Sequence, residues 1–132
     1  MKKLKYEADV KNWLLKAEED LKWARSTLRG RFYTQVCFVA QQVAEKSLKA
    51  FLLSCDVVPL KTHSLPVLLK ECSANKNDFE QFKNKVEILD KYYAPTRYPD
   101  LGLLEGYSPK TAEEALMIAT EIFGFVKGTI DL

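Results

Sequence analysis

The sequence predicts an all-α fold, an up-and-down bundle of four long helices and one short helix. Through most of the chain, apolar residues recur at alternating steps of three and four, which places them on one face of a helix. No segment alternates apolar and polar residues with the period of two that a half-buried strand shows. Most connections between the helical segments are short, as they are between antiparallel neighbours in a bundle.

The first helix is predicted to run from Val10 to about Gly30, a residue that can end a helix. Its apolar stripe consists of Val10, Leu14, Ala17, Leu21, Ala24 and Leu28. A second helix begins around Phe32 and Tyr33, and its run TQVCFVAQQVAEKSLKAFLL is apolar on most of its circumference, which is typical of the central helix of a bundle. Its one polar stripe consists of Gln42, Glu45, Lys46 and Lys49, with Gln41 at the edge.

Proline and small polar residues mark the third and fourth helices. Ser64 is a candidate N-cap and a proline lies in the first turn after it, so a short third helix is expected to run to about Ala74. The fourth helix is expected from Asp78 through Tyr93 on another stripe of alternating threes and fours. It ends just before Pro95, because proline disfavours a helical conformation in the preceding residue.

The last helix follows a long connection, residues 95–109, that is rich in proline, glycine and tyrosine. Connections of this length in a small bundle are often functional. Thr111 and Glu114 have the spacing of a capping box, which predicts the start of the last helix. Its core stripe consists of Ala115, Ile118, Ile122, Phe125 and Val126.

Length and composition predict one ordinary globular domain over residues 1–132, whose mass of 15.1 kDa is enough to bury a core without disulfides. The net charge of +2 is too small to predict nucleic-acid binding, so a binding face must come from local clustering. Cys37, Cys55 and Cys72 lack metal-ligand spacing and are expected to be reduced thiols in or beside the core. The lack of a signal-peptide pattern, and of a run of roughly 18 apolar residues, predicts a cytoplasmic protein. We expect no metal and no cofactor.

The stretch YYAPTRYPD, residues 92–100, gathers aromatic rings and a guanidinium where the fourth helix must end. Arg97 has the fork geometry that matches phosphate oxygens, and Tyr98 has no core register and could stack on a base. Tyr93 continues the apolar stripe and is expected in the core, whereas Tyr92 lies off that stripe. If this stretch faces the polar stripe of the second helix, the two would line a cleft that suits a phosphate with an attached base.

Each of these features also has a purely structural interpretation. The polar stripe could be a solvated face on which Glu45 and Lys49 form an i,i+4 ion pair. Arg97 could pair with Asp100 or Glu45 and tie the connection to the second helix. His63, the only histidine, could partner a helix cap or a carboxylate, or could lie beside Arg97 as a proton-transfer group.

Three stretches, FYTQVCFVAQQVAEKSLKAFLL, KTHSLPVLLKEC and LDKYYAPTRYPD, occur in this order within a resemblance that covers nearly the whole chain. They resemble the HEPN domain in its small stand-alone bacterial and archaeal form. The resemblance implies a helical bundle that commonly dimerises and often acts beside a minimal nucleotidyltransferase encoded as a separate chain. In several branches of that family, the domain binds nucleotides or works as a metal-independent ribonuclease.

The ribonuclease branches carry a histidine a few positions after the arginine that matches Arg97, and no histidine follows it here. We therefore expect a homodimer that binds a nucleotide or RNA and partners a nucleotidyltransferase in a toxin-antitoxin-like pair. One alternative is a metal-independent endoribonuclease with Arg97 and His63 as catalytic groups. Another is an architectural dimerisation module, which an apolar exposed face on the fourth helix would support. The expected ligand-binding residues are Gln42, Glu45, Lys46, Lys49, Tyr92, Arg97, Tyr98 and Asp100.

Overall fold

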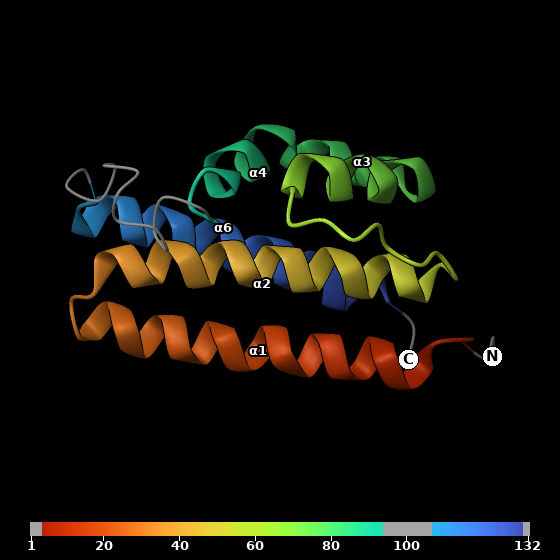
Figure 1. Cartoon of the computed structure of the whole chain (residues 1–132), viewed down its shortest axis with the longest axis horizontal. Helices are drawn as coiled ribbons and strands as arrows, with labels where there is room; N and C mark the ends of the chain where they lie inside the picture. The colour runs from red at the N-terminus through yellow and green to blue at the C-terminus, as the bar shows by residue number, and fades with distance from the viewer. Residues whose placement is uncertain (1–3, 94–106, 131–132) are drawn as a thin grey trace.

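Helices account for all the regular structure in the described residues, which are 4–93 and 107–130 of this computed structural model (Figure 1). These ranges contain no strand, and the predicted all-α bundle is confirmed. The three long helices are α1 (Glu7–Arg29), α2 (Tyr33–Ser54) and α6 (Pro109–Thr129). The shorter segments are α3 (Leu65–Asn75), the 3₁₀ helix η1 (Asn77–Phe82) and α4 (Lys83–Asp90). Most of the connection before α6, with Arg97, Tyr98 and Asp100, lies outside the described residues.

α1 and α2 form an antiparallel hairpin along one side of the bundle (Figure 1). Gly30 follows α1 as its C-cap, as the sequence predicted. The chain reverses through Arg31, which has a left-handed φ of 66°, and the Phe32 amide donates to the Thr27 carbonyl oxygen at 3.1 Å. The buried stripe of α1 consists of Val10, Leu14, Ala17, Leu21 and Ala24. A short turn thus places the apolar stripe of α1 against α2.

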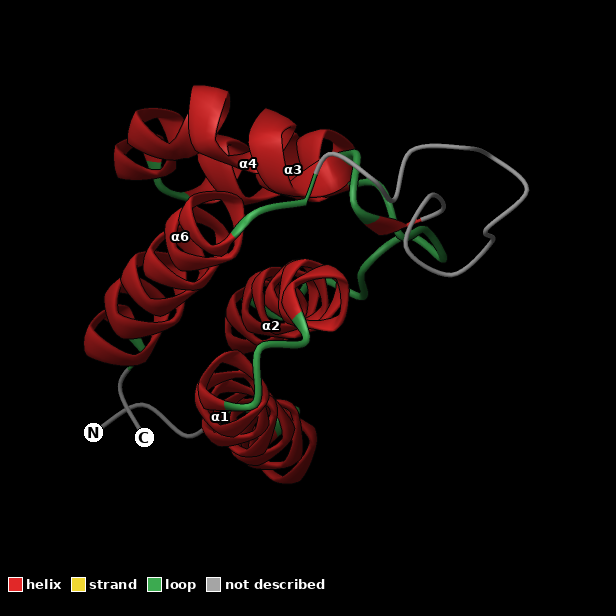
Figure 2. Cartoon of the chain, turned by 90° about the vertical axis from the view of Figure 1, so that its left-hand side faces the viewer, coloured by secondary structure: helices red, strands yellow, loops and turns green. Residues whose placement is uncertain are grey.

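α2 is the central helix of the bundle, as its apolar circumference predicted. Seen end-on, it lies between α1 on one side and α3, α4 and α6 on the other (Figure 2). Its fully buried apolar residues include Val36, Ala40, Val43, Ala44, Leu48 and Leu52. Because burying one large aliphatic side chain contributes roughly 1.5 to 3 kcal/mol, this helix supplies a large share of the core.

The connection after α2 leads into α3, whose start is capped as predicted. The Ser64 hydroxyl oxygen accepts from the Val67 amide at 3.3 Å. The Leu65 amide donates to the Asp90 Oδ1 at 2.9 Å. This second bond ties the start of α3 to the end of α4.

The fourth helical segment is composite and differs from the single long helix expected from Asp78. It begins as η1 and becomes an α-helix only at Lys83. Phe79 and Phe82 lie three residues apart, and 3₁₀ geometry aligns such a pair on one side. Both rings are buried and meet Phe125 edge-on, at centroid distances of 5.0 and 5.3 Å. The 3₁₀ segment thus packs both of its rings against Phe125 of α6.

α6 begins before the predicted capping box of Thr111 and Glu114, and that prediction is wrong. Pro109 occupies the first helical position, where its fixed φ and missing N–H are well tolerated. Ser108 therefore becomes the N-cap, and its hydroxyl oxygen accepts from the Thr111 amide at 3.2 Å. The predicted core stripe is otherwise confirmed, with Ala115, Ile118, Ile122 and Val126 buried and Phe125 half-buried.

Two expectations from composition can be compared with the structure. Cys37 and Cys72 are buried, Cys55 is half-buried, and all three are reduced thiols. Burial raises the pKa of Cys37 to about 12 and also raises the pKa of Cys72, as expected for core thiols. Of the helices in the described ranges, none has both the length and the apolar character that crossing a membrane requires.

Candidate functional site

A polar cluster centred on Glu45 lies on the side of α2 that faces the connection before α3. We call Gln41, Glu45, Lys49 and His63 the Glu45 cluster. Glu45 is only 4% exposed, and its carboxylate accepts from the Lys49 ammonium at 3.0 Å. The His63 Nδ1 lies 3.0 and 3.2 Å from the two carboxylate oxygens. A buried carboxylate is costly unless it is paired in this way.

Helix geometry explains how α2 presents this cluster. Gln41, Glu45 and Lys49 are spaced four residues apart, so they follow one another along one face. The fully buried Gln41 amide donates to the Glu45 carboxylate at 3.4 Å and to the His63 carbonyl oxygen at 3.1 Å. Gln41 thus fixes the backbone of the connection immediately before the Ser64 cap.

His63 combines high exposure with fixed contacts. Its side chain is 56% exposed, yet one ring face stacks on Tyr93 with 4.5 Å between centroids and 23° between planes. Tyr93 in turn stacks on Phe38 of α2, at 6.0 Å and 25°. When a neutral imidazole donates from Nδ1 to a carboxylate, its Nε2 carries the free lone pair. The described residues place no hydrogen-bond partner on Nε2.

The rest of the polar stripe is also paired with other groups. Lys46 forms a close ion pair with Asp20 of α1. Lys49 lies over the Trp13 ring, 5.6 Å from its centroid, and Gln42 donates to the Gln41 side-chain oxygen at 2.6 Å. The predicted Glu45 to Lys49 pair is confirmed. However, Glu45 is buried, and Gln42, Lys46 and Lys49 are half-buried. The interpretation of this stripe as a solvated face is therefore wrong.

The two tyrosines after α4 exchange the positions expected for them. Tyr92 is only 2% exposed and meets the Tyr107 ring edge-on at 5.4 Å, and burial raises its pKa to about 12. Tyr93 is half-buried beside His63. α4 ends at Asp90, and the Tyr92 amide donates to the Leu89 carbonyl oxygen in a turn. Helical periodicity therefore no longer applies there, and the buried Tyr92 ring offers no face to a ligand.

The predicted site residues fall into three groups: those that the structure brings together, those that it places elsewhere and those that it does not describe. Gln42 and Lys46 bond to Gln41 and Asp20, and Tyr92 is buried. Glu45, Lys49 and His63 meet in the Glu45 cluster. Arg97, Tyr98 and Asp100 lie outside the described residues, so their predicted roles stay predictions. Sequence reasoning placed Gln41 only at the edge of the polar stripe, and it did not assign roles to Trp13, Asp20 or Phe38. The four-residue spacing of Gln41 and Glu45 could have indicated the hydrogen bond between their side chains.

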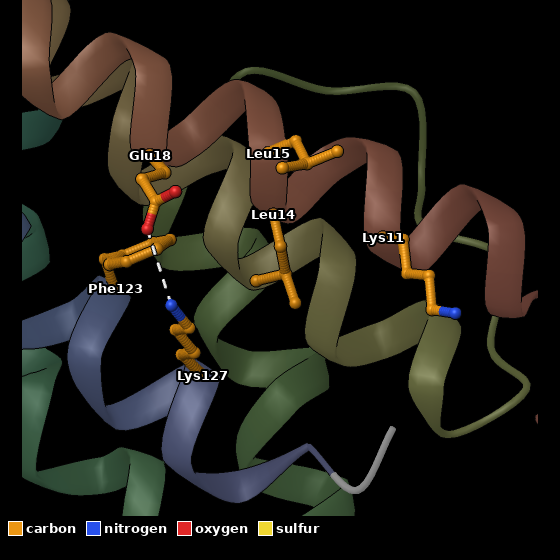
Figure 3. A pocket seen from close by; sticks show the side chains of 6 residues that line it. All are labelled: Lys11, Leu14, Leu15, Glu18, Phe123 and Lys127. Atoms are coloured by element: carbon orange, nitrogen blue, oxygen red, sulfur yellow. Dashed lines mark hydrogen bonds and ion pairs between the residues drawn. The ribbon is translucent and has the colours of Figure 1, made fainter.

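One absence and one further surface complete the description of the site. In residues 4–93 and 107–130, no group of three or more His, Cys, Asp or Glu side chains could hold a metal. A separate hollow between α1 and α6 is mostly apolar, with Leu14, Leu15 and Phe123 in its lining (Figure 3). Glu18 and Lys127 pair across it at 3.4 Å. This hollow shares no lining residue with the Glu45 cluster.

Comparisons with known proteins identify the family of this chain. The profile of the HEPN domain matches residues 10–129. The crystal structure of TT1696 from Thermus thermophilus is similar at 36% identity with a TM-score of 0.83, over 90% of this chain and 96% of that one. The crystal structure of ST0689, an archaeal HEPN homologue, is similar at 34% identity with a TM-score of 0.77, over 92% and 98%.

A curated relative adds a functional name. This chain is 25% identical over 131 residues to "Putative toxin MJ1304" of Methanocaldococcus jannaschii. The match covers 89% of this chain and 86% of that protein, so the two correspond over most of their lengths.

Proposed function

This chain belongs to the HEPN domain family, and on that premise we propose that it binds a nucleotide or RNA beside the Glu45 cluster. We further propose that it acts with a minimal nucleotidyltransferase as one half of a toxin-antitoxin-like pair. The toxin name of the Methanocaldococcus relative supports such a role. The ligand would carry a phosphate and a base, since His63 and Tyr93 offer aromatic rings and Arg97, four residues after Tyr93 in the sequence, offers a cation.

The observation that carries the binding proposal is an exposed His63 ring that is held in place by its contacts and stacks on Tyr93, a residue close to Arg97 in the sequence. His63 stacks on Tyr93, and Arg97 follows Tyr93 by only four residues, which span at most about 14 Å. Lys46 and Lys49 already have carboxylate partners. We therefore assign the main phosphate contact to Arg97, whose guanidinium fork matches phosphate oxygens.

Binding can be tested with a fluorescently labelled single-stranded RNA oligomer and with AMP, measured by anisotropy and by calorimetry. We expect Arg97→Gln to weaken RNA binding at least about tenfold and to lower the salt slope by about 0.7, as loss of one phosphate contact should. Arg25→Gln, at an exposed position on α1, is the matched control and should change affinity less than about twofold. If the wild-type protein binds neither ligand at millimolar concentration, the proposal is wrong.

The partner proposal has its own test, because ligand binding and partner binding are separable. A nucleotidyltransferase encoded next to this chain should co-elute with it when the two are co-expressed. An unrelated small nucleotidyltransferase is the control and should elute separately. A neighbouring gene without nucleotidyltransferase character, or two chains that elute apart, would count against the pair.

The second candidate function is a metal-independent endoribonuclease, and the orientation of the His63 imidazole favours it. Glu45 holds Nδ1, which leaves Nε2 of this largely exposed side chain as the nitrogen that could exchange a proton with a ribose hydroxyl. Arg97 would stabilise the charged phosphorane. RNA cleavage in excess chelator that disappears in His63→Ala would establish this function. An intact substrate after prolonged incubation would leave only the binding role.

The homodimer that we propose would cover apolar surface on α1 and on the turn after it. The apolar circumference of α2 gives no reason for a dimer, because α2 is covered by its own chain. Instead, Leu15, Trp23 and Phe32 are each about 60% exposed, at 61%, 58% and 61%. The exposed residues of η1 and α4 are polar, so the apolar face that would support an architectural module does not occur there. Light scattering should give twice the chain mass of 15.1 kDa, and a monomer mass would refute the dimer.

A further inference from the structure

We infer that the outer face of the His63 ring is a stacking platform for a nucleobase. This assignment rests on the proposed nucleotide or RNA binding and specifies where the base would lie. It replaces Tyr92, which the sequence suggested as a ligand contact but which is buried at 2% exposure.

Three aromatic rings form a ladder that ends at the protein surface. Phe38 of α2 stacks on Tyr93 at 6.0 Å and 25°, and Tyr93 stacks on His63 at 4.5 Å and 23°. Tyr93 thus covers one face of the imidazole, while 56% of the His63 side chain stays exposed. A base on the opposite face would continue the ladder as its next ring. Nucleic-acid-binding proteins commonly hold unpaired bases by stacking of this kind.

The His63 ring is held more firmly than an exposed side chain usually is. Its Nδ1 is bonded to the buried Glu45 carboxylate, and its own carbonyl oxygen accepts from the buried Gln41 amide. Two buried polar side chains therefore orient one exposed ring. A ring whose rotation is already restricted loses less entropy when a ligand stacks on it, which favours binding.

Core packing gives no reason for this arrangement. With more than half of its side chain exposed, His63 adds little to apolar burial, and Glu45 is already paired with Lys49. The network is costly to build, since it takes a carboxylate out of water. Pairing of Glu45 with Lys49 offsets much of that cost, so we assign the additional bond to His63 to holding the ring for a ligand.

The test compares the affinities of AMP, the RNA oligomer and ribose 5-phosphate, which has no base, for three variants at one position. His63→Phe keeps a flat ring but cannot bond to Glu45 or exchange a proton. His63→Gln keeps a polar side chain without a ring, and His63→Ala removes both. Circular dichroism melting of each variant confirms that it is folded, which we expect because the ring is exposed.

The platform predicts a distinct order of affinities. His63→Ala and His63→Gln should weaken AMP binding about 5- to 150-fold, the range that one stacked base contributes, and should leave ribose 5-phosphate within about twofold. His63→Phe should stay within about threefold of wild type for every ligand. Tyr93→Leu, which removes the middle ring, should weaken AMP binding in the same direction as His63→Ala.

Other outcomes would overturn the inference in distinguishable ways. If His63→Ala binds AMP as tightly as wild type while Arg97→Gln does not, the protein binds nucleotides but the base does not lie on His63. If His63→Gln binds like wild type and His63→Phe does not, a polar or proton-exchanging role replaces stacking. If wild type binds none of the three ligands, both the platform and the proposed function fail.

Discussion

Replacing Glu45 with glutamine should destabilise the fold, because the Lys49 ammonium loses its carboxylate partner. The substitution keeps the shape and one acceptor oxygen but removes the charge that faces Lys49 at 3.0 Å. The Lys49 side chain is only 14% exposed, so water offsets little of the loss. Breaking a buried ion pair by removing one partner typically costs about 3–5 kcal/mol. The retained amide oxygen and the Trp13 ring under Lys49 reduce this figure, and we expect about 2 kcal/mol.

Thermal and urea denaturation measure this change directly. For a chain of 132 residues, an unfolding entropy of about 2.1 cal/mol/K per residue converts about 2 kcal/mol into a fall of about 7 °C in Tm. Glu121→Gln is the matched control, because its pair with Lys85 lies at the surface with side chains 39% and 42% exposed. The control should cost less than about 0.5 kcal/mol.

A double-mutant cycle with Lys49→Met isolates the pair itself. If the two charges interact as the geometry indicates, the double variant should be more stable than the sum of the single effects by about 1 to 2 kcal/mol. Strict additivity, or a Glu45→Gln effect no larger than that of Glu121→Gln, would refute the reasoning that the Glu45 cluster is a buried, coupled network.

The remaining predictions concern a helix cap, a buried tyrosine and the cysteines. Ser108→Ala should lower the free energy of unfolding by about 1 kcal/mol in urea titrations, because the Thr111 amide in the first turn of α6 loses its acceptor. Burial raises the pKa of Tyr92 from 10.0 to about 12, so the unfolded state loses its proton first as pH rises through this window. Stability should therefore fall between pH 10 and 12 by about 1.4 kcal/mol per pH unit from this group, and Tyr92→Phe should flatten that part of the profile. Because thiolates react and burial raises the thiol pKa, Cys37 and Cys72 should react with a thiol reagent at about pH 8 only after unfolding, whereas Cys55 should react first. Labelling of all three at one rate in the folded protein would contradict this assignment.

Local sequence patterns predicted most of the fold because they act over one or two helical turns. The end of α1 at Gly30 and the cap of α3 at Ser64 both followed from single residues with a known preference. The 3₁₀ winding of η1 was not predicted. In this segment Phe79 and Phe82 contact Phe125 of a helix that is distant in the sequence, and a local pattern does not show such contacts. The burial of Tyr92 was missed because the helical register ends just before it.

The candidate site was predictable as a set of residues but not as an arrangement. Spacing along α2 identified Glu45 and Lys49, and chemistry identified His63 as a possible partner of some carboxylate. The meeting of Glu45 and His63 depends on how the connection before α3 returns to α2, which no local pattern encodes. The predicted contact between Arg97 and Glu45 lies partly outside the described residues and stays a prediction.

The central claim, that a nucleotide or RNA binds beside the Glu45 cluster, can be tested at one side chain. His63 is the only histidine in the chain, so its imidazole gives a single pair of ring signals in a proton-carbon NMR spectrum. On titration with AMP or the RNA oligomer, we expect both ring signals to move upfield and to saturate at the Kd found by anisotropy, as a base stacked on the ring requires. Ribose 5-phosphate should move them much less. Ring signals that stay in place while the labelled RNA binds, or that respond equally to ribose 5-phosphate, would contradict the account.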